Sequence, residues 1–353
     1  MFQETSHNLH LLPNLPYQWI KDHPVHLKSD RRYRELLQAK PTKKLSIIIP
    51  FRNELRSVES FLVALDMAKI HSYPMPTTLI FVQNGCTDGT DKVLTNWIHV
   101  KNSTRQTQNL EILHLTTPIE SKANALNIAN EVALQSNSDI AISLDMDNYC
   151  DINTIPELYL ALSQSDASLI TGTTITQPRR IPRGKLKDIC IQYTCFNPKK
   201  DEAVVNGMVQ AWKPRDIKDI GGFPHVIGED YATGLLLRSQ GKTHRRLPEA
   251  KVWGYRANTF EDKFKQLVRG QRSLIQLREL YPHLRDQIQN DMPATNNLLN
   301  QVTAHWHWAS KNYKRIPFAL INMPIIWAAQ YQAKRQHQED PYVKTWTQIE
   351  STR

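Results

Sequence analysis

Short apolar runs alternate with amphipathic segments along the first half of the chain. Runs rich in β-branched residues, which favour buried strands, lie at 45–50, 77–82, 110–115 and 139–144. Segments with apolar residues at helical spacing lie between or after them, at 57–70, 88–98 and 123–134. Strands and helices in this order predict βαβ units, so we expect an α/β fold with a mostly parallel central sheet flanked by helices.

The pattern loosens after residue 150. It predicts a helix at 154–164 and a strand at 167–175, then a basic stretch at 179–187 and helices at 230–239 and 260–280. We therefore divide the chain into three parts. These are an N-terminal extension at 1–44, one α/β domain at 45–280 and a helical C-terminal extension at 281–353.

Composition narrows the class of protein. Of the 353 residues, 40% are hydrophobic and 22% are charged, which is ordinary for a globular protein and excludes global disorder. The net charge of +10 favours an anionic partner: nucleic acid, a phosphate-bearing ligand or an acidic membrane. The four cysteines form no C-x-x-C pair or zinc spacing, and the N-terminus shows no signal peptide. We therefore expect reduced thiols in a cytoplasmic protein.

Two carboxylates follow the fourth predicted strand. Asp145 and Asp147 are two residues apart, so in an extended segment they point to the same side. Ligands of parallel α/β sheets bind beyond the carboxyl ends of the strands. A pair of hard oxygen ligands there suits Mg²⁺ or Mn²⁺ carrying a diphosphate, although a solvated loop is the alternative for a D-x-D motif alone.

Three further groups of charged residues are candidates. Glu229 and Asp230 open a predicted helix, where they either complement the helix dipole or supply a general base. Arg269 and Arg272 are about one helical turn apart, which suits either a phosphate ligand or a solvated face. Lys122 begins a helix, where a cation is unfavourable, and this hints at an anionic ligand.

Taken in order, these segments resemble the family 2 glycosyltransferases, which use the GT-A, nucleotide-diphospho-sugar transferase fold. The matching stretches run from about residue 45 to residue 273. They are S-I-I-I-P-F-R-N-E at 46–54, N-G-C-T-D-G-T at 84–90, K-A-N-A-L-N at 122–127, D-M-D at 145–147, G-G-F at 221–223 with E-D at 229–230, and R-x-x-R at 269–272.

The resemblance implies an enzyme that moves a sugar from a nucleoside-diphosphate donor, such as a UDP- or GDP-sugar, to an acceptor hydroxyl with inversion. It implies a divalent cation, Mn²⁺ or Mg²⁺, held at Asp145 and Asp147, with Asp147 as the direct ligand. Asp230, beside Glu229, is implied to be the catalytic base. The residues implied to contact substrate are Pro50, Arg52, Glu54, Asn84, Asp88, Lys122, Asp145, Gly222, Arg269 and Arg272.

The sequence departs from the family pattern at several positions. Gln83 and Asn84 stand where many relatives have two acidic residues, which leaves the preferred nucleotide open. Ser273 stands where the last motif usually has Trp. Without that Trp and without spanning helices, we expect a single transfer rather than processive synthesis.

The acceptor implied by the resemblance is a glycan or a lipid-linked sugar, as in the biosynthesis of cell-envelope polysaccharides or glycolipids. An apolar segment at 316–329, flanked by basic residues, suits contact with the cytoplasmic face of a membrane, but a helix packed on the catalytic domain is the alternative. At 14 residues, with two prolines, this segment is too short to span a bilayer.

Other functions fit the sequence less well. A catalytically inactive family member that binds sugar nucleotides is one alternative, and a basic nucleic-acid-binding protein is another. The second lacks any recognisable nucleic-acid-binding motif, so we expect no nucleic acid partner. A nicotinamide enzyme is disfavoured because no G-x-G-x-x-G follows the first strand.

Overall fold

A single eight-stranded sheet forms the centre of the molecule. The computed structural model describes residues 30–39, 41–103, 109–178, 205, 207–257, 259–291, 306, 310 and 316–341. The strands are β1 (Leu45–Phe51), β2 (Thr77–Asn84), β3 (Leu110–Thr117), β4 (Ile140–Leu144), β5 (Asn148–Cys150), β6 (Leu169–Pro178), β7 (Val209–Trp212) and β8 (His244–Arg256). Their order across the sheet is β3-β2-β1-β4-β7-β6-β8-β5.

Most neighbouring strands are parallel, as predicted. β1 pairs in parallel with both β2 and β4, β2 pairs in parallel with β3, and β6 pairs in parallel with β8. β7 is antiparallel to β4 and β6, and β5 is antiparallel to β8. All seven residues of β1 are buried, which explains its continuous apolar run.

Helices cover both faces of the sheet. The described helices are α2 (Arg31–Gln38), α3 (Val58–Met67), α4 (Thr90–Ser103), α5 (Lys122–Gln135), α6 (Thr154–Ser163), α8 (Pro214–Asp219), α9 (Glu229–Ser239), α10 (Phe260–Leu280), α11 (Arg285–Asp291) and α13 (Ile316–Glu339). Residues of α2, α3, α4 and α6 share one apolar cluster with the sheet, while α5, α8 and α9 pack on its other face. The α/β fold with a parallel core is therefore confirmed.

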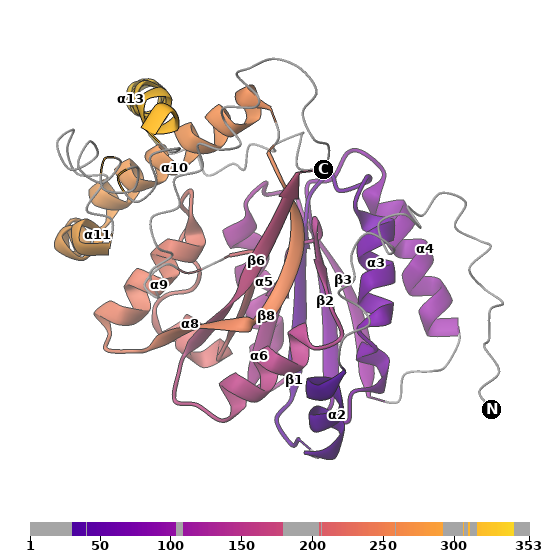
Figure 1. Ribbon diagram of the computed structural model, residues 1–353. Coiled ribbons are helices and arrows are strands. Elements are labelled where there is room, and N and C mark those ends of the chain that lie inside the picture. The colour runs from indigo at the N-terminus through magenta and orange to yellow at the C-terminus, as the bar shows by residue number, and fades with distance from the viewer. Residues whose placement is uncertain are drawn as a thin grey trace.

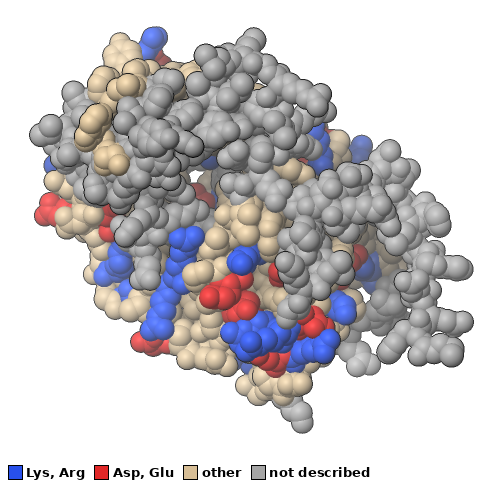
Figure 2. Space-filling model, viewed as in Figure 1, with Lys and Arg blue, Asp and Glu red and all other residues tan. Residues whose placement is uncertain are grey.

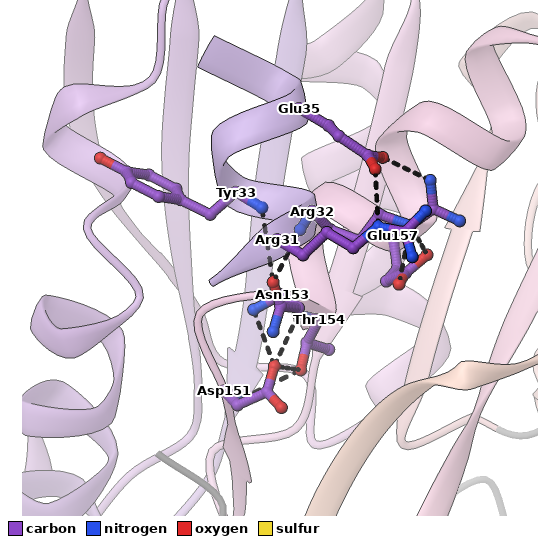
Figure 3. A network of polar contacts seen from close by, with 8 residues as sticks. All are labelled: Arg31, Arg32, Tyr33, Glu35, Asp151, Asn153, Thr154 and Glu157. Carbon is purple, nitrogen blue, oxygen red and sulfur yellow. Dashed lines mark hydrogen bonds and ion pairs between the residues drawn. The ribbon is translucent and has the colours of Figure 1, made fainter. Parts of the chain in front are cut away.

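The helix α2 belongs to this core. Its Tyr33 and Leu36 are buried in the same cluster as the strands. The backbone N–H groups of Arg32 and Tyr33 donate to Asn153 Oδ1, at 3.1 and 3.4 Å, and Arg32 pairs with Glu157 (Figure 3). Basic and acidic side chains intermingle over α2 (Figure 2). The core thus begins upstream of the boundary predicted at residue 45.

The predicted C-terminal extension is helical where it is described. Figure 1 shows α10, α11 and α13 together at the upper left, to one side of the sheet. α13 packs on α10 through Ala329 and Ala333, which are buried with Val268. Among the described residues, no helix has the length and apolarity needed to cross a membrane. The basic stretch at 179–187 lies outside the described residues.

A row of polar side chains is buried in the middle of the sheet. Ser143 of β4 and Thr171 of β6 are both paired in register with Gln210 of β7. All three residues are fully buried, and within the described part of the chain Ser143 Oγ, Thr171 Oγ1 and both polar atoms of the Gln210 side chain have no hydrogen-bond partner. A buried polar group without a partner costs stability.

We expect the substitution Thr171→Val to stabilise the protein, because valine has nearly the same shape and removes the unpaired hydroxyl. The expected gain in the free energy of unfolding is about 1 kcal/mol, or roughly 2 °C in the melting temperature. Thr173→Val is the control, since Thr173 Oγ1 accepts a hydrogen bond from Arg246 at 3.3 Å and its loss should not stabilise. A lower melting temperature for Thr171→Val would mean that the hydroxyl binds a partner such as buried water.

Candidate active site

Charged residues from four separate elements meet at the carboxyl end of β4. Lys122 comes from the start of α5, Asp145 and Asp147 follow β4, Glu229 and Asp230 open α9, and Arg269 lies on α10. Lys122 pairs with Asp145 and Glu229, and Arg269 interacts electrostatically with all four carboxylates. The structure therefore brings together six of the charged residues that the sequence nominated.

Lys122 lies at the centre of this cluster. Its side chain is only 7% exposed, and its Nζ lies 2.5 Å from Asp145 Oδ1 and 3.7 Å from Glu229 Oε1. Nζ also donates a hydrogen bond to the carbonyl oxygen of Gly207 at 3.0 Å. Burial alone would lower the pKa of Lys122, but the two carboxylates reverse this and raise it, so the ammonium is charged at neutral pH. The anions expected beside Lys122 at the start of α5 are therefore present within the protein, as the carboxylates of Asp145 and Glu229.

Glu229 and Asp230 differ in their surroundings. Burial raises the pKa of Glu229 to about 7, with the Lys122 cation opposing the shift and Asp230 adding to it. Asp230 instead accepts two backbone hydrogen bonds, from Gly207 N–H to Oδ2 at 2.9 Å and from Tyr231 N–H to Oδ1 at 2.8 Å. These bonds fix the orientation of the Asp230 carboxylate.

Gly207 joins the cation and the predicted base. Its N–H binds Asp230 and its carbonyl oxygen binds Lys122. A Cβ atom at this position would lie 2.8 Å from Asp230 Oδ2 and 2.9 Å from Asp230 Cβ, so only glycine permits this approach. Gly207 was not predicted from the sequence, because no motif includes it and its role depends on backbone atoms.

The two arginines of α10 have different surroundings. Arg269 is half-buried; burial lowers its pKa, while the nearby carboxylates Glu229 and Asp230 act to raise it. Arg272 donates from Nη2 to the carbonyl oxygen of Asp340, at the end of α13. The structure thus places Arg269 in the carboxylate cluster and directs Arg272 toward the C-terminal helix.

The loops after β1 and β2, predicted to contact the nucleotide, are tied to each other. Asp88 accepts hydrogen bonds from Leu55 N–H at 3.0 Å and from the Thr90 hydroxyl at 2.6 Å. Thr90 Oγ1 in turn accepts from Glu54 N–H at 2.8 Å. Asp88 therefore holds the loop that follows Pro50 and Phe51, the last residues of β1, against the start of α4.

Arg52 and Asn84 connect these loops to the segment before α5. Arg52 pairs with Glu120 at 2.5 Å. Asn84, implied by the resemblance to contact substrate, is 4% exposed, and its Oδ1 accepts a hydrogen bond from Ser121 N–H at 3.0 Å. Asn84 therefore holds Ser121, the residue just before Lys122 at the N-terminus of α5.

Gly222 lies in a loop that is clamped to α5. Asn127 Oδ1 accepts from Phe223 N–H at 2.7 Å, and Asn127 Nδ2 donates to the Phe223 carbonyl oxygen at 2.9 Å. Gly222 has a φ of +90°, and a Cβ there would lie 2.6 Å from Asn127 Oδ1. The K-A-N-A-L-N and G-G-F segments are thus joined through one side-chain amide.

The cluster contains carboxylate oxygens, the kind of ligand that a divalent cation such as Mg²⁺ prefers. Within the described residues, no group of three His, Cys, Asp or Glu side chains forms a metal site. Asp145 is engaged by Lys122, whereas Asp147 accepts a hydrogen bond from the Asn148 side chain at 2.7 Å. Mg²⁺ commonly uses one or two carboxylates together with substrate phosphates, and Asp147 can supply one.

The fold is of the GT-A type, and the carboxylates beyond β4 lie at the carboxyl end of its parallel strands. Residues 46–207 match the profile of the family described as Glycosyl transferase family 2. The matched segment runs from β1 through β4 and includes the D-M-D motif, so the family model agrees with the resemblance found in the sequence.

Solved structures of glycosyltransferases are similar to this chain. The mannosyltransferase PcManGT from Pyrobaculum calidifontis, in complex with GDP-Man and Mn²⁺, has the same fold; it is 17% identical, with a TM-score of 0.52 over 86% of this chain and 82% of that chain. TarS 1–349 from S. aureus, in complex with UDP-GlcNAc, is 14% identical, with a TM-score of 0.44 over 86% and 93%. No curated protein sequence matches the chain.

We expect the raised pKa of Glu229 to make the stability of the unliganded protein depend on pH. The folded state binds a proton more tightly than the unfolded state, whose glutamate has a pKa near 4.5. The free energy of unfolding should therefore fall as the pH rises from about 4.5 to about 7, by up to roughly 3 kcal/mol. Glu229→Gln should lose this dependence, which chemical denaturation across that range would measure. Equal pH profiles for the two proteins would contradict the assignment.

Proposed function

We propose that the protein is an inverting, metal-dependent glycosyltransferase that makes a single transfer from a nucleoside-diphosphate sugar to an acceptor hydroxyl. The observation that carries the proposal is the Asp230 carboxylate, oriented by two backbone N–H groups beside Asp147, Lys122 and Arg269. A fixed carboxylate is suited to take a proton from a hydroxyl.

The charge balance of the cluster supports the need for a cation. Four carboxylates face two cationic side chains, so the site is net negative when Glu229 is ionised. An anionic diphosphate is repelled by such a site unless a divalent cation intervenes. The PcManGT complex holds both GDP-Man and Mn²⁺, which supports a GDP-sugar donor and Mn²⁺ here; a UDP-sugar and Mg²⁺ are the other donor and cation that the sequence resemblance implies.

In the proposed reaction, Asp230 accepts the proton of the acceptor hydroxyl as its oxygen attacks the anomeric carbon. The bond from that carbon to the diphosphate oxygen breaks, and the nucleoside diphosphate leaves from the opposite face. Arg269 stabilises the charge that develops on the leaving group. A bound cation, with Asp147 as its protein ligand, would supply further stabilisation of the diphosphate. Lys122 keeps Asp145 and Glu229 in place beside the reacting groups.

The donor side of the site is proposed to be lined by Pro50, Arg52, Glu54, Asn84, Asp88, Lys122, Asp145, Gly222, Arg269 and Arg272. Among these, Asn84 acts by placing Ser121 at the start of α5. Arg272 lies where α10 meets the end of α13, and it donates a hydrogen bond to the carbonyl oxygen of Asp340.

We propose a glycan or lipid-linked acceptor, as in cell-envelope polysaccharide or glycolipid synthesis, and peripheral contact with the cytoplasmic face of a membrane. α13 supports this contact, because Leu320, Trp327 and Tyr331 are exposed on it. Apolar and aromatic side chains on one helix suit the membrane interface. Lys334 and Arg335, near its C-terminal end, add basic groups that attract anionic lipid headgroups.

We expect Asp230→Asn to lower kcat by at least about 100-fold, because an amide cannot act as a general base. The affinity for the nucleotide sugar should stay within a few-fold of wild type. Asp219→Asn, at an exposed position on α8, is the control and should turn over normally. Turnover would be measured as release of nucleoside diphosphate, and a wild-type rate in Asp230→Asn would disprove the base assignment.

We expect Asp147→Ala to abolish the Mn²⁺-dependent stabilisation of the protein by its nucleotide. The measurement is a thermal-shift screen of nucleoside diphosphates and their sugars, with and without Mn²⁺. A ligand at about 100 times its dissociation constant adds about 2.7 kcal/mol to the stability of wild type. Asp166→Ala, at an exposed residue, should behave as wild type. An equal metal-dependent shift in Asp147→Ala would exclude this residue as the ligand.

A further inference from the structure

Ile227, two residues before the start of α9, is hydrogen-bonded through both of its backbone polar groups to side chains of α10. Ile227 N–H donates to Gln276 Oε1 at 3.0 Å, and the Ile227 carbonyl oxygen accepts from the Ser273 hydroxyl. Gln276 and Ser273 are buried, at 3% and 7% exposure. Both backbone polar groups of Ile227 are therefore fixed by side chains that are themselves held in the interior.

The same stretch of α10 also holds the end of α13. Gln276 Nε2 donates to the Pro341 carbonyl oxygen at 3.1 Å, and Arg272 donates to the carbonyl oxygen of Asp340. Gln276 lies four residues after Arg272 and three after Ser273, so on the helix it is a neighbour of both. The Gln276 amide thus bridges two segments: its oxygen binds the loop before α9 and its nitrogen binds the end of α13.

The position of Ile227 determines where the carboxylates lie. Ile227 is followed by Gly228, which caps α9 with a φ of +81°, and then by Glu229 and Asp230. A Cβ at residue 228 would lie 2.5 Å from Ser273 Oγ, so the loop passes directly against α10. Catalysis is sensitive to displacements of about 1 Å, which can cost on the order of 100-fold in rate.

We propose that Gln276 is a positioning residue that couples the docking of α13 on α10 to the placement of Asp230. The proposal rests on the proposed role of Asp230 as the base. When α13 is seated, the amide of Gln276 is held by Pro341 and presents its oxygen to Ile227 N–H. When α13 is displaced, the amide loses its hydrogen bond to Pro341 and the loop before α9 is less well fixed.

The first test is Gln276→Met, which keeps the volume and removes both hydrogen bonds. We expect kcat to fall about tenfold while the dissociation constant of the nucleotide sugar stays within about twofold, because Gln276 acts on the placement of the base. Gln266→Met is the matched control on the same helix, where Gln266 Oε1 accepts from Lys263. The control should keep the wild-type kcat.

The second test displaces α13 without touching the loop. Ala333 is fully buried against Val268, so Ala333→Asp places a carboxylate in an apolar contact and weakens the docking of α13. We expect kcat to fall as in Gln276→Met, and the neighbouring exposed substitution Gln332→Asp to leave it unchanged. In the double variant Gln276→Met with Ala333→Asp, the loss should not exceed the larger single loss by more than about twofold.

Amide hydrogen exchange gives a readout that needs no turnover. Gly207 N–H is bonded to Asp230, so its exchange should be faster in Gln276→Met and in Ala333→Asp than in wild type. Unchanged kcat and exchange in Gln276→Met, with Asp230→Asn inactive, would overturn the coupling and leave the base assignment intact. Additive losses in the double variant, or unchanged kcat and exchange in folded Ala333→Asp, would overturn the part played by α13. A wild-type kcat in Asp230→Asn would instead contradict the proposed function, because Asp230 would then not be the base.

Discussion

The buried ammonium of Lys122 is the interaction on which the site depends. Carboxylates of like charge repel strongly in a low-dielectric interior, and each prefers to be protonated there. Lys122 lies between Asp145 and Glu229 and keeps both close to the end of β4, although a cation at a helix N-terminus opposes the helix dipole. Even with this cation, burial leaves the pKa of Glu229 at about 7. The attraction of Lys122 thus offsets only part of the cost of burying a negative charge at Glu229.

The sheet order explains how residues so distant in the sequence reach this cation. β4 is placed between β1 and β7, so the residues that follow β4 lie beside the residue pair that precedes β7. Gly207 therefore comes within reach of Lys122 on one side and Asp230 on the other. The Asn127 clamp on Phe223 ties the same helix, α5, to the loop leading toward α9. The site is thus assembled by hydrogen bonds that join side chains to backbone groups of distant segments.

The parts that could be predicted from the sequence are those with a local signal. β1, β2, β3 and β4 are long enough and apolar enough to be recognised, and the helices at 229–239 and 260–280 show clear spacing. β7 has four residues and carries the buried Gln210, and β8 contains several charged residues, so neither shows the pattern of a buried strand. The six charged residues that cluster beyond β4 were nominated from the sequence by motif. Gly207 and Gln276 were missed, because they act through backbone atoms of distant segments.

The helix α10 shows that the spacing of two residues along a helix does not by itself show that they share a function. Arg269 and Arg272 are about one turn apart, and spacing suggested that both grip one ligand. In the structure Arg269 lies among the carboxylates, while Arg272 binds the end of α13 together with Gln276. Ser273, where a bulky aromatic residue would be expected from the resemblance, is small enough to let Gly228 pass against α10 and still binds the Ile227 carbonyl. The departure from the family pattern is thus matched by a local contact that holds the loop leading into α9, where Glu229 and Asp230 lie.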